Sequence, residues 1–384
     1  MALHTELAAE LAALETGGLR RVRRVMSSPQ GARVHVDGRD YTAFCSNDYL
    51  GLAADPRLAA AAHDGVDRYG VGAGASHLIL GHSAAHHALE AALAVFTGLP
   101  RALLFATGYM ANMGIVSALA GRGDAVFADR LNHASLNDAV VVSRAAFRRY
   151  AHGDMAALAR LLENTKARRR LVITDAVFSM DGDLAPVPEL VALCERFDAY
   201  LVLDDAHGFG VLGAGGRGVL EHFAVASPRI IYMATLGKAA GVSGAFVAGD
   251  AAVIETLIQR ARPYIYTTAT PPLLAQALLA SLPLIAEEGW RRERLSELIA
   301  QLKQQLTGFP LQLMPSATPI QPLLVGGNDA ALALSAHLAA QGLLVPAIRP
   351  PTVPQGTARL RISLSAEHTA DDVARLTAAL RAGA

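Results

Sequence analysis

Short apolar runs alternate with amphipathic stretches from about residue 57 onward. Continuous apolar runs are typical of strands buried on both faces, whereas apolar spacings of three and four are typical of covering helices. The pattern predicts strands at 102–106, 125–128, 171–174, 201–203, 230–233 and 245–248. It predicts helices near 110–119, 134–143, 155–163 and 187–197. We therefore expect an α/β fold with a mostly parallel sheet between layers of helices.

The two ends of the chain follow other patterns. A short amphipathic helix at 4–14 precedes a basic run at 19–24, and Asp37-Gly38 is a hairpin signal between strands at 32–36 and 41–44. After Pro271-Pro272 the pattern predicts a long helical stretch at 273–306, strands at 322–325 and 359–364, and helices at 330–341 and 371–381. We predict an N-terminal segment at 1–56, a large domain at 57–287 and a small C-terminal domain at 288–384.

Composition excludes several classes of partner. The 384 residues include 34 basic and 34 acidic side chains, so the net charge is zero and neither nucleic acid nor an anionic membrane is expected as a partner. The first twenty residues carry acidic side chains and no long apolar block, which argues against a targeting peptide. Cys45 and Cys194 are the only cysteines, and we expect both to be reduced. These features predict a cytoplasmic protein.

Carboxylates follow the predicted strand at 201–203. Asp204, Asp205 and His207 come directly after it, at the end of the strand where ligands bind in such sheets. A helix cap or turn, or a metal site, would also explain these residues.

A lysine follows the next predicted strand. Lys238 lies among small residues, and lysines seldom occupy buried positions. Loss of hydration lowers the pKa of an amine and makes it nucleophilic, as a Schiff-base lysine requires. Thr235, three residues earlier, can offer a hydroxyl to a phosphate.

Pyridoxal 5′-phosphate (PLP) explains these separate features together. Its pyridine nitrogen needs an acidic partner, which Asp204 can supply, and His207 can reach its phenolic oxygen. Its phosphate needs a helix start, which the turn at Gly108 offers, and His133 follows another strand and can stack on the ring. The order of these elements is more specific than any one of them.

The motifs also resemble a known family. Four motifs are similar to those of the α-oxoamine synthases: Ser46-Asn47-Asp48-Tyr49-Leu50-Gly51-Leu52, Thr107-Gly108-Tyr109-x-Ala111-Asn112, Asp204-Asp205-Ala206-His207-Gly208 and Thr235-Leu236-Gly237-Lys238. The resemblance covers about residues 20–380. It implies a fold-type-I PLP-dependent transferase, with a large domain and a smaller α+β domain, that acylates an amino acid with a thioester and removes its carboxylate.

The resemblance assigns roles to cofactor-binding residues. Gly108, Tyr109 and Thr235 would bind the phosphate, and His133 would stack on the ring. Ser179 and His207 would contact the phenolic side. Asp204 would hold the pyridine nitrogen. Lys238 would carry the cofactor and move the substrate proton, and His133 would hydrogen-bond the developing carbonyl oxygen or the carboxylate.

The resemblance also assigns substrate contacts and a partner. Arg361 would clamp the substrate carboxylate with help from Asn47, and Arg21 and Thr352 would contact the acyl substrate. The spacing also allows Arg20 in place of Arg21. The family forms homodimers with shared active sites, in which Thr267 and Thr268 would reach the partner's phosphate.

Two stretches favour one branch of the family. Ala206 in the Asp-Asp-Ala-His motif and the segment at 347–354 indicate the branch that joins L-alanine to a pimeloyl thioester in biotin synthesis. Glycine C-acetyltransferases more often carry Ser at the position of Ala206, and 5-aminolevulinate synthases usually show Asp-Glu-Val-His. Glycine C-acetyltransferase or another α-oxoamine synthase remains the alternative. Whether coenzyme A or a carrier protein brings the acyl group stays open.

Other functions fit less well. The glycines at 70–74 suggest a dinucleotide site, but the segment before them is helical. His82, His86 and His87 suggest a metal hydrolase, but no glutamate lies between them as in HExxH. A cofactor-free acyltransferase would need a nucleophile with its base, and the surroundings of Cys45 and Cys194 do not indicate one. An aminotransferase would lack the motif at 46–52, which we call the entry motif. A non-enzymatic protein would have lost residues of the lysine site, and no position indicates such a loss.

Overall fold

The computed structural model describes residues 2–383, which divide into two compact units. The large unit contains residues 47–179 and 183–293, and the small unit contains the segments before 47 and after 293, together with 180–182. The chain thus changes units at 46/47, 179/180, 182/183 and 293/294. The domain bounds expected from the sequence, 1–56, 57–287 and 288–384, remain predictions.

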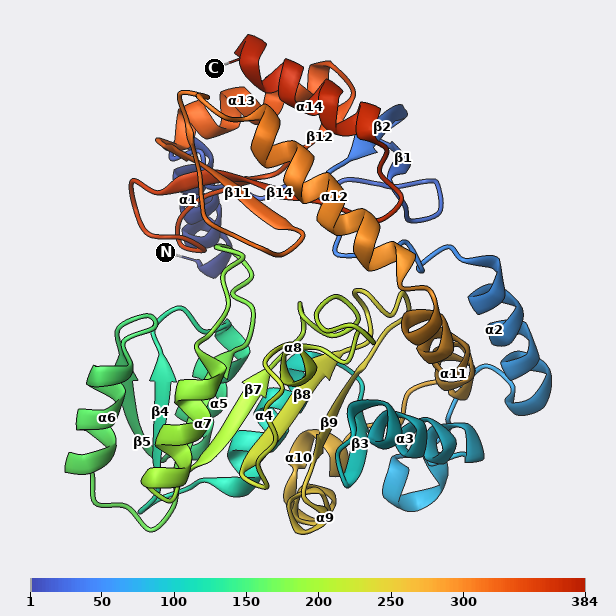
Figure 1. Ribbon diagram of the computed structural model, residues 1–384, viewed down its shortest axis with the longest axis vertical. Coiled ribbons are helices and arrows are strands. Elements are labelled where there is room, and N and C mark those ends of the chain that lie inside the picture. Colours follow the sequence, from blue (N-terminus) through green and yellow to red (C-terminus); the bar gives the residue numbers. More distant parts are fainter. Residues whose placement is uncertain (1, 384) are drawn as a thin grey trace. The chain divides into compact units, whose positions relative to one another are not determined.

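The large unit is built on a seven-stranded sheet with the order β3-β9-β8-β7-β6-β4-β5 (Figure 1). Its strands are β3 (Arg101–Phe105), β4 (Ala125–Asp129), β5 (Ala146–Tyr150), β6 (Arg170–Asp175), β7 (Tyr200–Asp204), β8 (Ile230–Thr235) and β9 (Ala245–Gly249). Strands β5, β4, β6, β7 and β8 pair in parallel, and β9 is antiparallel to β8 and β3. The predicted, mostly parallel sheet is confirmed.

Helices flank this sheet (Figure 1). They are α2 (Pro56–Tyr69), the π-helical turn η1 (His77–Gly81), α3 (Ala84–Thr97), α4 (Gly108–Leu119), α5 (Ala134–Ser143), α6 (Met155–Asn164), α7 (Val187–Arg196), α8 (Val219–His222), α9 (Ala251–Arg260), α10 (Arg262–Ile265) and α11 (Pro272–Glu287). Helix α4 contacts α5, α9 and α10, while α6 contacts α7. Alternate strand residues such as Val126, Ile173, Ile231 and Val247 join α4, α5 and α9 in one fully buried core.

The small unit contains two smaller sheets. One has the order β1-β2-β12 and the other β10-β11-β14-β13. The strands are β1 (Arg33–Val36), β2 (Arg39–Ala43), β10 (Gln312–Leu313), β11 (Ile320–Gly326), β12 (Leu343–Leu344), β13 (Ala347–Ile348) and β14 (Ala358–Ser363). The helices are α1 (Leu3–Thr16), α12 (Trp290–Gln305), which begins just before this unit, α13 (Asn328–Ala340) and α14 (Ala370–Gly383). No helix within the described residues is long and apolar enough to span a membrane.

Three local features test the pattern-based predictions. The Asp37-Gly38 hairpin is confirmed, and both residues have the positive φ angles, 50° and 77°, that this tight turn requires. The stretch at 273–306 is two helices, because the chain leaves helical geometry at Glu288 and Gly289 follows it. Strand β5 was not predicted, because it is an edge strand whose residues are mostly exposed and include two arginines.

Candidate active site

A cavity of about 140 Å³ lies in the large unit at the carboxyl ends of its central strands. Asp175, Asp204 and Thr235, the last residues of β6, β7 and β8, all line it. The complete lining is Gly108, Tyr109, Asn112, His133, Ser135, Asp175, Val177, Ser179, Asp204, Ala206, His207, Met233, Thr235 and Lys238. Parallel strands bring these residues together because their carboxyl ends meet at one edge of the sheet.

Asp204, the last residue of β7, and Asp205, which follows it, lie in different surroundings. Asp204 lines the cavity, and its carboxylate accepts hydrogen bonds from Asn112 Nδ2 at 2.7 Å and from the Ala206 N–H at 3.1 Å. Asp205 is fully buried elsewhere, where it accepts hydrogen bonds from the Tyr232 hydroxyl and the Val219 N–H, both at 2.7 Å. Burial raises the pKa of Asp205 to about 7. The metal interpretation of Asp204, Asp205 and His207 is therefore wrong.

A hydrogen-bond chain connects Asp204 to His133. The Asn112 amide donates to both Asp204 and Ser135 Oγ, the latter at 2.9 Å. Ser135 Oγ lies 2.7 Å from His133 Nδ1, which also accepts the Ser135 N–H at 3.3 Å. Because Nδ1 accepts, the proton of a neutral His133 ring resides on Nε2. The His133 N–H donates to Asp175 at 3.0 Å.

Asp175 is the second carboxylate of the cavity. Burial and the nearby Asp204 carboxylate raise the pKa of Asp175 well above its usual value, while the His133 N–H and Lys238 oppose this shift. Two carboxylates in one buried cavity disfavour double ionisation. The surroundings of Asp175 therefore favour its neutral, protonated form.

Lys238 and the residues expected to bind the phosphate also line the cavity. Lys238 lies in the tight turn after β8, where its carbonyl accepts the Gly241 N–H at 2.8 Å. Gly108 begins α4 behind its N-cap residue Thr107, and a Cβ at Gly108 would meet Thr235 Cγ2 at 2.6 Å. Only glycine therefore fits this approach between α4 and β8. The first N–H groups of a helix have no partner inside the helix and attract anions.

His207 is oriented by a residue far away in sequence. Its Nδ1 lies 2.6 Å from the Tyr49 hydroxyl, which donates to Asn47 Oδ1 at 3.1 Å. Since the tyrosine proton is used on Asn47, the hydroxyl accepts the Nδ1–H of His207. The entry motif Asn47-Asp48-Tyr49 thus contacts the cavity through His207.

Other predicted residues lie outside this cavity's lining. Thr267 and Thr268 follow α10 and are half-buried and exposed, respectively. Arg361 is buried in β14 of the small unit, where its Nη1 donates to Ser363 Oγ at 3.0 Å. Their proposed contacts with substrate or partner stay predictions.

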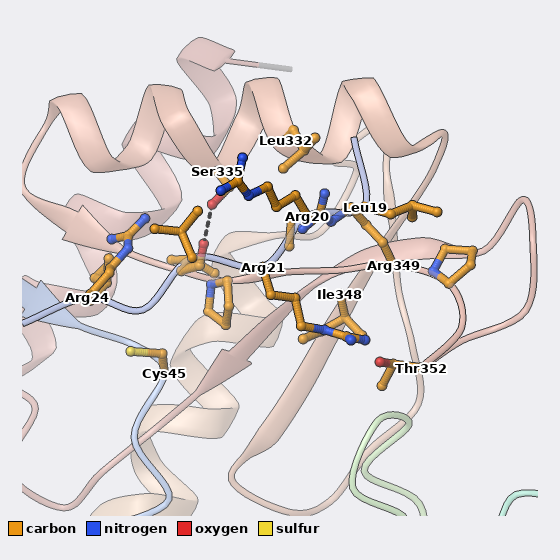
Figure 2. A pocket seen from close by; sticks show the side chains of 16 residues that line it. Leu19, Arg20, Arg21, Arg24, Cys45, Leu332, Ser335, Ile348, Arg349 and Thr352 are labelled. Atoms are coloured by element: carbon orange, nitrogen blue, oxygen red, sulfur yellow. Dashed lines mark hydrogen bonds between the residues drawn. The ribbon is translucent and has the colours of Figure 1, made fainter. Parts of the chain in front are cut away.

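Arg21 and Thr352 line a separate cavity of about 540 Å³ in the small unit (Figure 2). Four arginines contribute to its lining: Arg20, Arg21, Arg24 and Arg349. Figure 2 shows the Arg21 side chain extending toward Ile348 and Thr352. Arg20 instead forms an ion pair with Glu15 of α1. The geometry therefore favours Arg21 over Arg20 as the residue near Thr352.

Known proteins share this fold and these sequence features. The family model Aminotransferase class I and II matches residues 39–380. A protein of Nitrosomonas europaea called 8-amino-7-oxononanoate synthase is 67% identical over 95% of each chain, and one of Nitrosomonas eutropha with the same name is 64% identical over 98% of each chain. The chain belongs to the 8-amino-7-oxononanoate synthase family.

Solved structures agree with this family assignment. The structure of 8-amino-7-oxononanoate synthase from Francisella tularensis has a TM-score of 0.78 and 32% identity, with 89% of this chain and 97% of that chain covered. Serine palmitoyltransferase from Sphingomonas wittichii has a TM-score of 0.93 and 32% identity over 98% and 96% of the two chains. A structure of SPT with PLP as the internal aldimine has a TM-score of 0.94 and 30% identity over 100% and 98%.

The cofactor of this synthase-family chain is PLP, and the cavity in the large unit fits it. An amine and a hydrogen-bonded carboxylate line the same cavity, and a helix start approaches it through Gly108. Asn112 Oδ1 and Asp175 Oδ1 are buried without a hydrogen-bond partner among the described residues. Buried polar atoms of this kind are expected where a polar group binds.

Several residues of this site were not predicted from the sequence. Asn112, Ser135 and Asp175 line the cavity, and Tyr49 orients His207. Asn112 and Tyr49 lie inside motifs that were noticed, but no role was assigned to them. Asp175 carried an available signal, because it ends the strand predicted at 171–174 as Asp204 ends its neighbour.

The fold does not support a dinucleotide site, a metal hydrolase of the HExxH type or a cysteine nucleophile. The glycines at 70–74 follow helix α2, so they lack the preceding strand that a dinucleotide fingerprint requires. His86 lies in a capping box with Ser83 at the start of α3, as expected for a helix start. Cys194 is buried in α7 with a pKa raised by burial, which disfavours a nucleophilic thiolate.

Proposed function

We propose that the protein condenses L-alanine with a pimeloyl thioester and releases 8-amino-7-oxononanoate, carbon dioxide and the free thiol. The observation that carries this proposal is the shared lining of one small cavity by Lys238, Asp204 and the start of α4. Relatives at 67% and 64% identity carry the synthase name, which supports the same reaction and a place in biotin biosynthesis.

The cavity residues divide the binding of PLP among them. Lys238 Nζ attaches the cofactor, and the Asp204 carboxylate holds the proton on the pyridine nitrogen. The N–H groups at Gly108 and Tyr109 bind the phosphate together with the Thr235 hydroxyl. Ser179 and His207 face the phenolic oxygen, and the His133 ring covers the face of the pyridine ring.

Proton movements in the reaction follow from these positions. Bound PLP supplies an electron sink for the negative charge on the alanine Cα. Lys238 Nζ, which lines the same cavity, would remove the Cα proton of alanine and later return it. The Asn112 amide keeps Asp204 in place at 2.7 Å. His133 Nε2–H donates to the oxygen that develops at the thioester carbonyl, because its Nδ1 already accepts from Ser135.

Substrate recognition uses arginines of the small unit. Arg361 and Asn47 bind the alanine carboxylate, a task that suits the planar guanidinium. Arg21 and Thr352 bind the acyl substrate in the 540 Å³ cavity, whose apolar members, such as Ile348 and Leu332, suit a hydrocarbon chain. A small-molecule acyl donor or one carried by a protein both fit this proposal.

We further propose a cytoplasmic homodimer with shared active sites. Leu78, Ile79, Leu80 and Val95 in η1 and α3 are exposed by 47%, 79%, 87% and 80%, and side chains of this type favour an interface. Thr267 and Thr268 lie after α10 and would reach the partner's phosphate. Sedimentation of the purified protein at twice the chain mass of 40.2 kDa would agree with this proposal.

A thiol-release assay tests the reaction. Alanine, glycine and serine are each combined with pimeloyl, acetyl, succinyl and palmitoyl thioesters, on coenzyme A and on a carrier protein. We expect the highest kcat/KM for alanine with the pimeloyl thioester. A preference for glycine with acetyl would indicate a glycine C-acetyltransferase, and a preference for serine with palmitoyl would indicate a reaction like that of the serine palmitoyltransferases.

A further inference from the structure

Three histidines converge in the large unit outside the lining of the Lys238 cavity. His77 begins η1, His82 follows this turn, and His86 lies in the first turn of α3. One ring nitrogen of each lies within 4.8 Å of those of the other two, and the Nδ1 atoms of His77 and His82 are 3.0 Å apart. These distances place three nitrogen donors around one point.

Burial disfavours the charged form of these three rings. Burial, together with the nearby His86 and His82, lowers the pKa of His77 to about 4. Burial also lowers the pKa of His82 and of His86. A neutral imidazole has the lone pair that metal coordination needs.

Neighbouring groups orient two of the rings. The Nε2–H of His86 donates to the Thr270 carbonyl at 2.9 Å, so its Nδ1 carries the lone pair. This Nδ1 now accepts the Ser83 N–H at 3.1 Å and lies 3.0 Å from Ser83 Oγ. The Tyr264 ring stacks on His77 at 4.9 Å between centroids. A backbone carbonyl that holds the second nitrogen is a common feature of metal-binding histidines.

An adjoining cavity of about 370 Å³ gives access to the cluster. His77, His82, His87 and Glu90 all contribute to its lining. Glu90 Oε2 lies 3.9 Å from His82 Nε2, and burial raises the pKa of Glu90 to about 7. This cavity adjoins the histidines and shares no lining residue with the Lys238 cavity.

We propose that His77, His82 and His86 bind a divalent transition-metal ion of the zinc class, with water as the fourth ligand. Imidazole donors suit zinc, copper, nickel and cobalt, whereas calcium and magnesium prefer oxygen. Two nitrogen ligands of a tetrahedral zinc lie roughly 3.3 Å apart, close to the His77–His82 separation, and His86 reaches that spacing with a shift on the order of 1 Å. The ion would connect η1 to the start of α3.

Cobalt provides a spectroscopic probe of this site. The tag-free holoenzyme is treated with a chelator, dialysed and titrated with Co²⁺, and absorption is followed at wavelengths longer than those of the cofactor. We expect the visible bands of tetrahedral cobalt to saturate at one ion per chain, and Zn²⁺ to abolish them. Zn²⁺ should also raise the melting temperature of the holoenzyme by a few degrees, since a ligand stabilises the state that binds it.

Variants locate the ion. His77→Ala should remove the cobalt bands, and His82→Asn, which keeps a polar side chain at a half-buried position, should do the same in a folded protein. His63→Ala, which changes an exposed histidine on α2, should retain them. A wild-type protein without tetrahedral bands, or undiminished bands in both cluster variants, would overturn the proposal. Thiol release is measured in parallel and does not decide the outcome.

Discussion

The two cavities that contain predicted site residues, one in each unit, are built in opposite ways. The cavity of about 140 Å³ in the large unit is lined by strand ends, and its polar groups hold one another by hydrogen bonds such as Asn112–Asp204. The cavity of about 540 Å³ in the small unit is lined by loops, short strands and helix α13 (Figure 2). Its lining includes apolar side chains and four arginines, of which Arg20, Arg21 and Arg24 are exposed. Fixed groups suit the repeated chemistry of a cofactor, and adaptable side chains suit a long flexible substrate.

This difference predicts how each region responds to substitution. Loss of a fixed group in the cavity of the large unit should impair the chemical step, because neighbouring groups cannot replace it. Loss of one arginine in the cavity of the small unit should weaken substrate binding only, because other arginines remain nearby. Three substitutions test this contrast, and a fourth tests an ion pair outside both cavities.

Lys238→Ala should have the largest effect. The variant loses both the covalent attachment and the base for the Cα proton, so kcat should fall on the order of 10⁴-fold or more. Thiol release with saturating alanine and pimeloyl thioester measures this change. Lys166→Ala, at an exposed position on the protein surface, is the matched control and should behave as wild type.

Asp204→Asn should have the next largest effect. The amide cannot hold a proton on the pyridine nitrogen, so kcat should fall roughly 10²- to 10³-fold while cofactor still binds. Asp205→Asn is the matched control, because Asp205 faces Tyr232 and Val219 instead of the cavity. Equal losses of kcat in the two variants would contradict the assignment of Asp204.

Arg21→Ala should act on binding. We expect the KM for the pimeloyl thioester to rise about tenfold, as for the loss of one charge-assisted hydrogen bond, with kcat nearly unchanged. Arg20→Ala should raise KM less, since Arg20 forms an ion pair with Glu15. A larger effect at Arg20 would exchange the two roles.

His152→Ala should have the smallest effect and act on stability. His152 contacts Asp129 at 3.1 Å and Asp183 at 2.8 Å, and hydrogen bonds to these carboxylates raise its pKa to about 10. The folded pKa exceeds the unfolded value of about 6.5, so the stabilisation is complete below pH 6.5 and disappears as pH rises through about 10.

Urea unfolding at pH 6, 8 and 10 measures this effect. Because the His152 side chain is 32% exposed, we expect a difference in unfolding free energy on the order of 1 kcal/mol at pH 6 that shrinks toward pH 10. A difference that grows with pH would contradict the ion-pair assignment.

The same contrast decides what the sequence could predict. Asp204 and Lys238 were predictable because residues after parallel strands must lie at one edge of the sheet. The Asn112–Asp204 hydrogen bond was not, because it joins residues 92 positions apart and leaves no periodic signal.

Surface features were harder to assign from the sequence. Strand β5 was missed because its exposed Arg148 and Arg149 disguise an edge strand. The choice between Arg20 and Arg21 depended on local side-chain directions, which become visible only in three dimensions.

The most direct test of the account is borohydride reduction of the holoenzyme followed by peptide mapping. Lys166 and Lys303 are the other two lysines of the chain, and both are exposed, so the three positions separate easily. The account predicts that the reduced cofactor is found on the peptide that contains Lys238, with loss of the visible absorption. A label on Lys166 or Lys303, or absence of any label in a protein that still releases thiol, would contradict it.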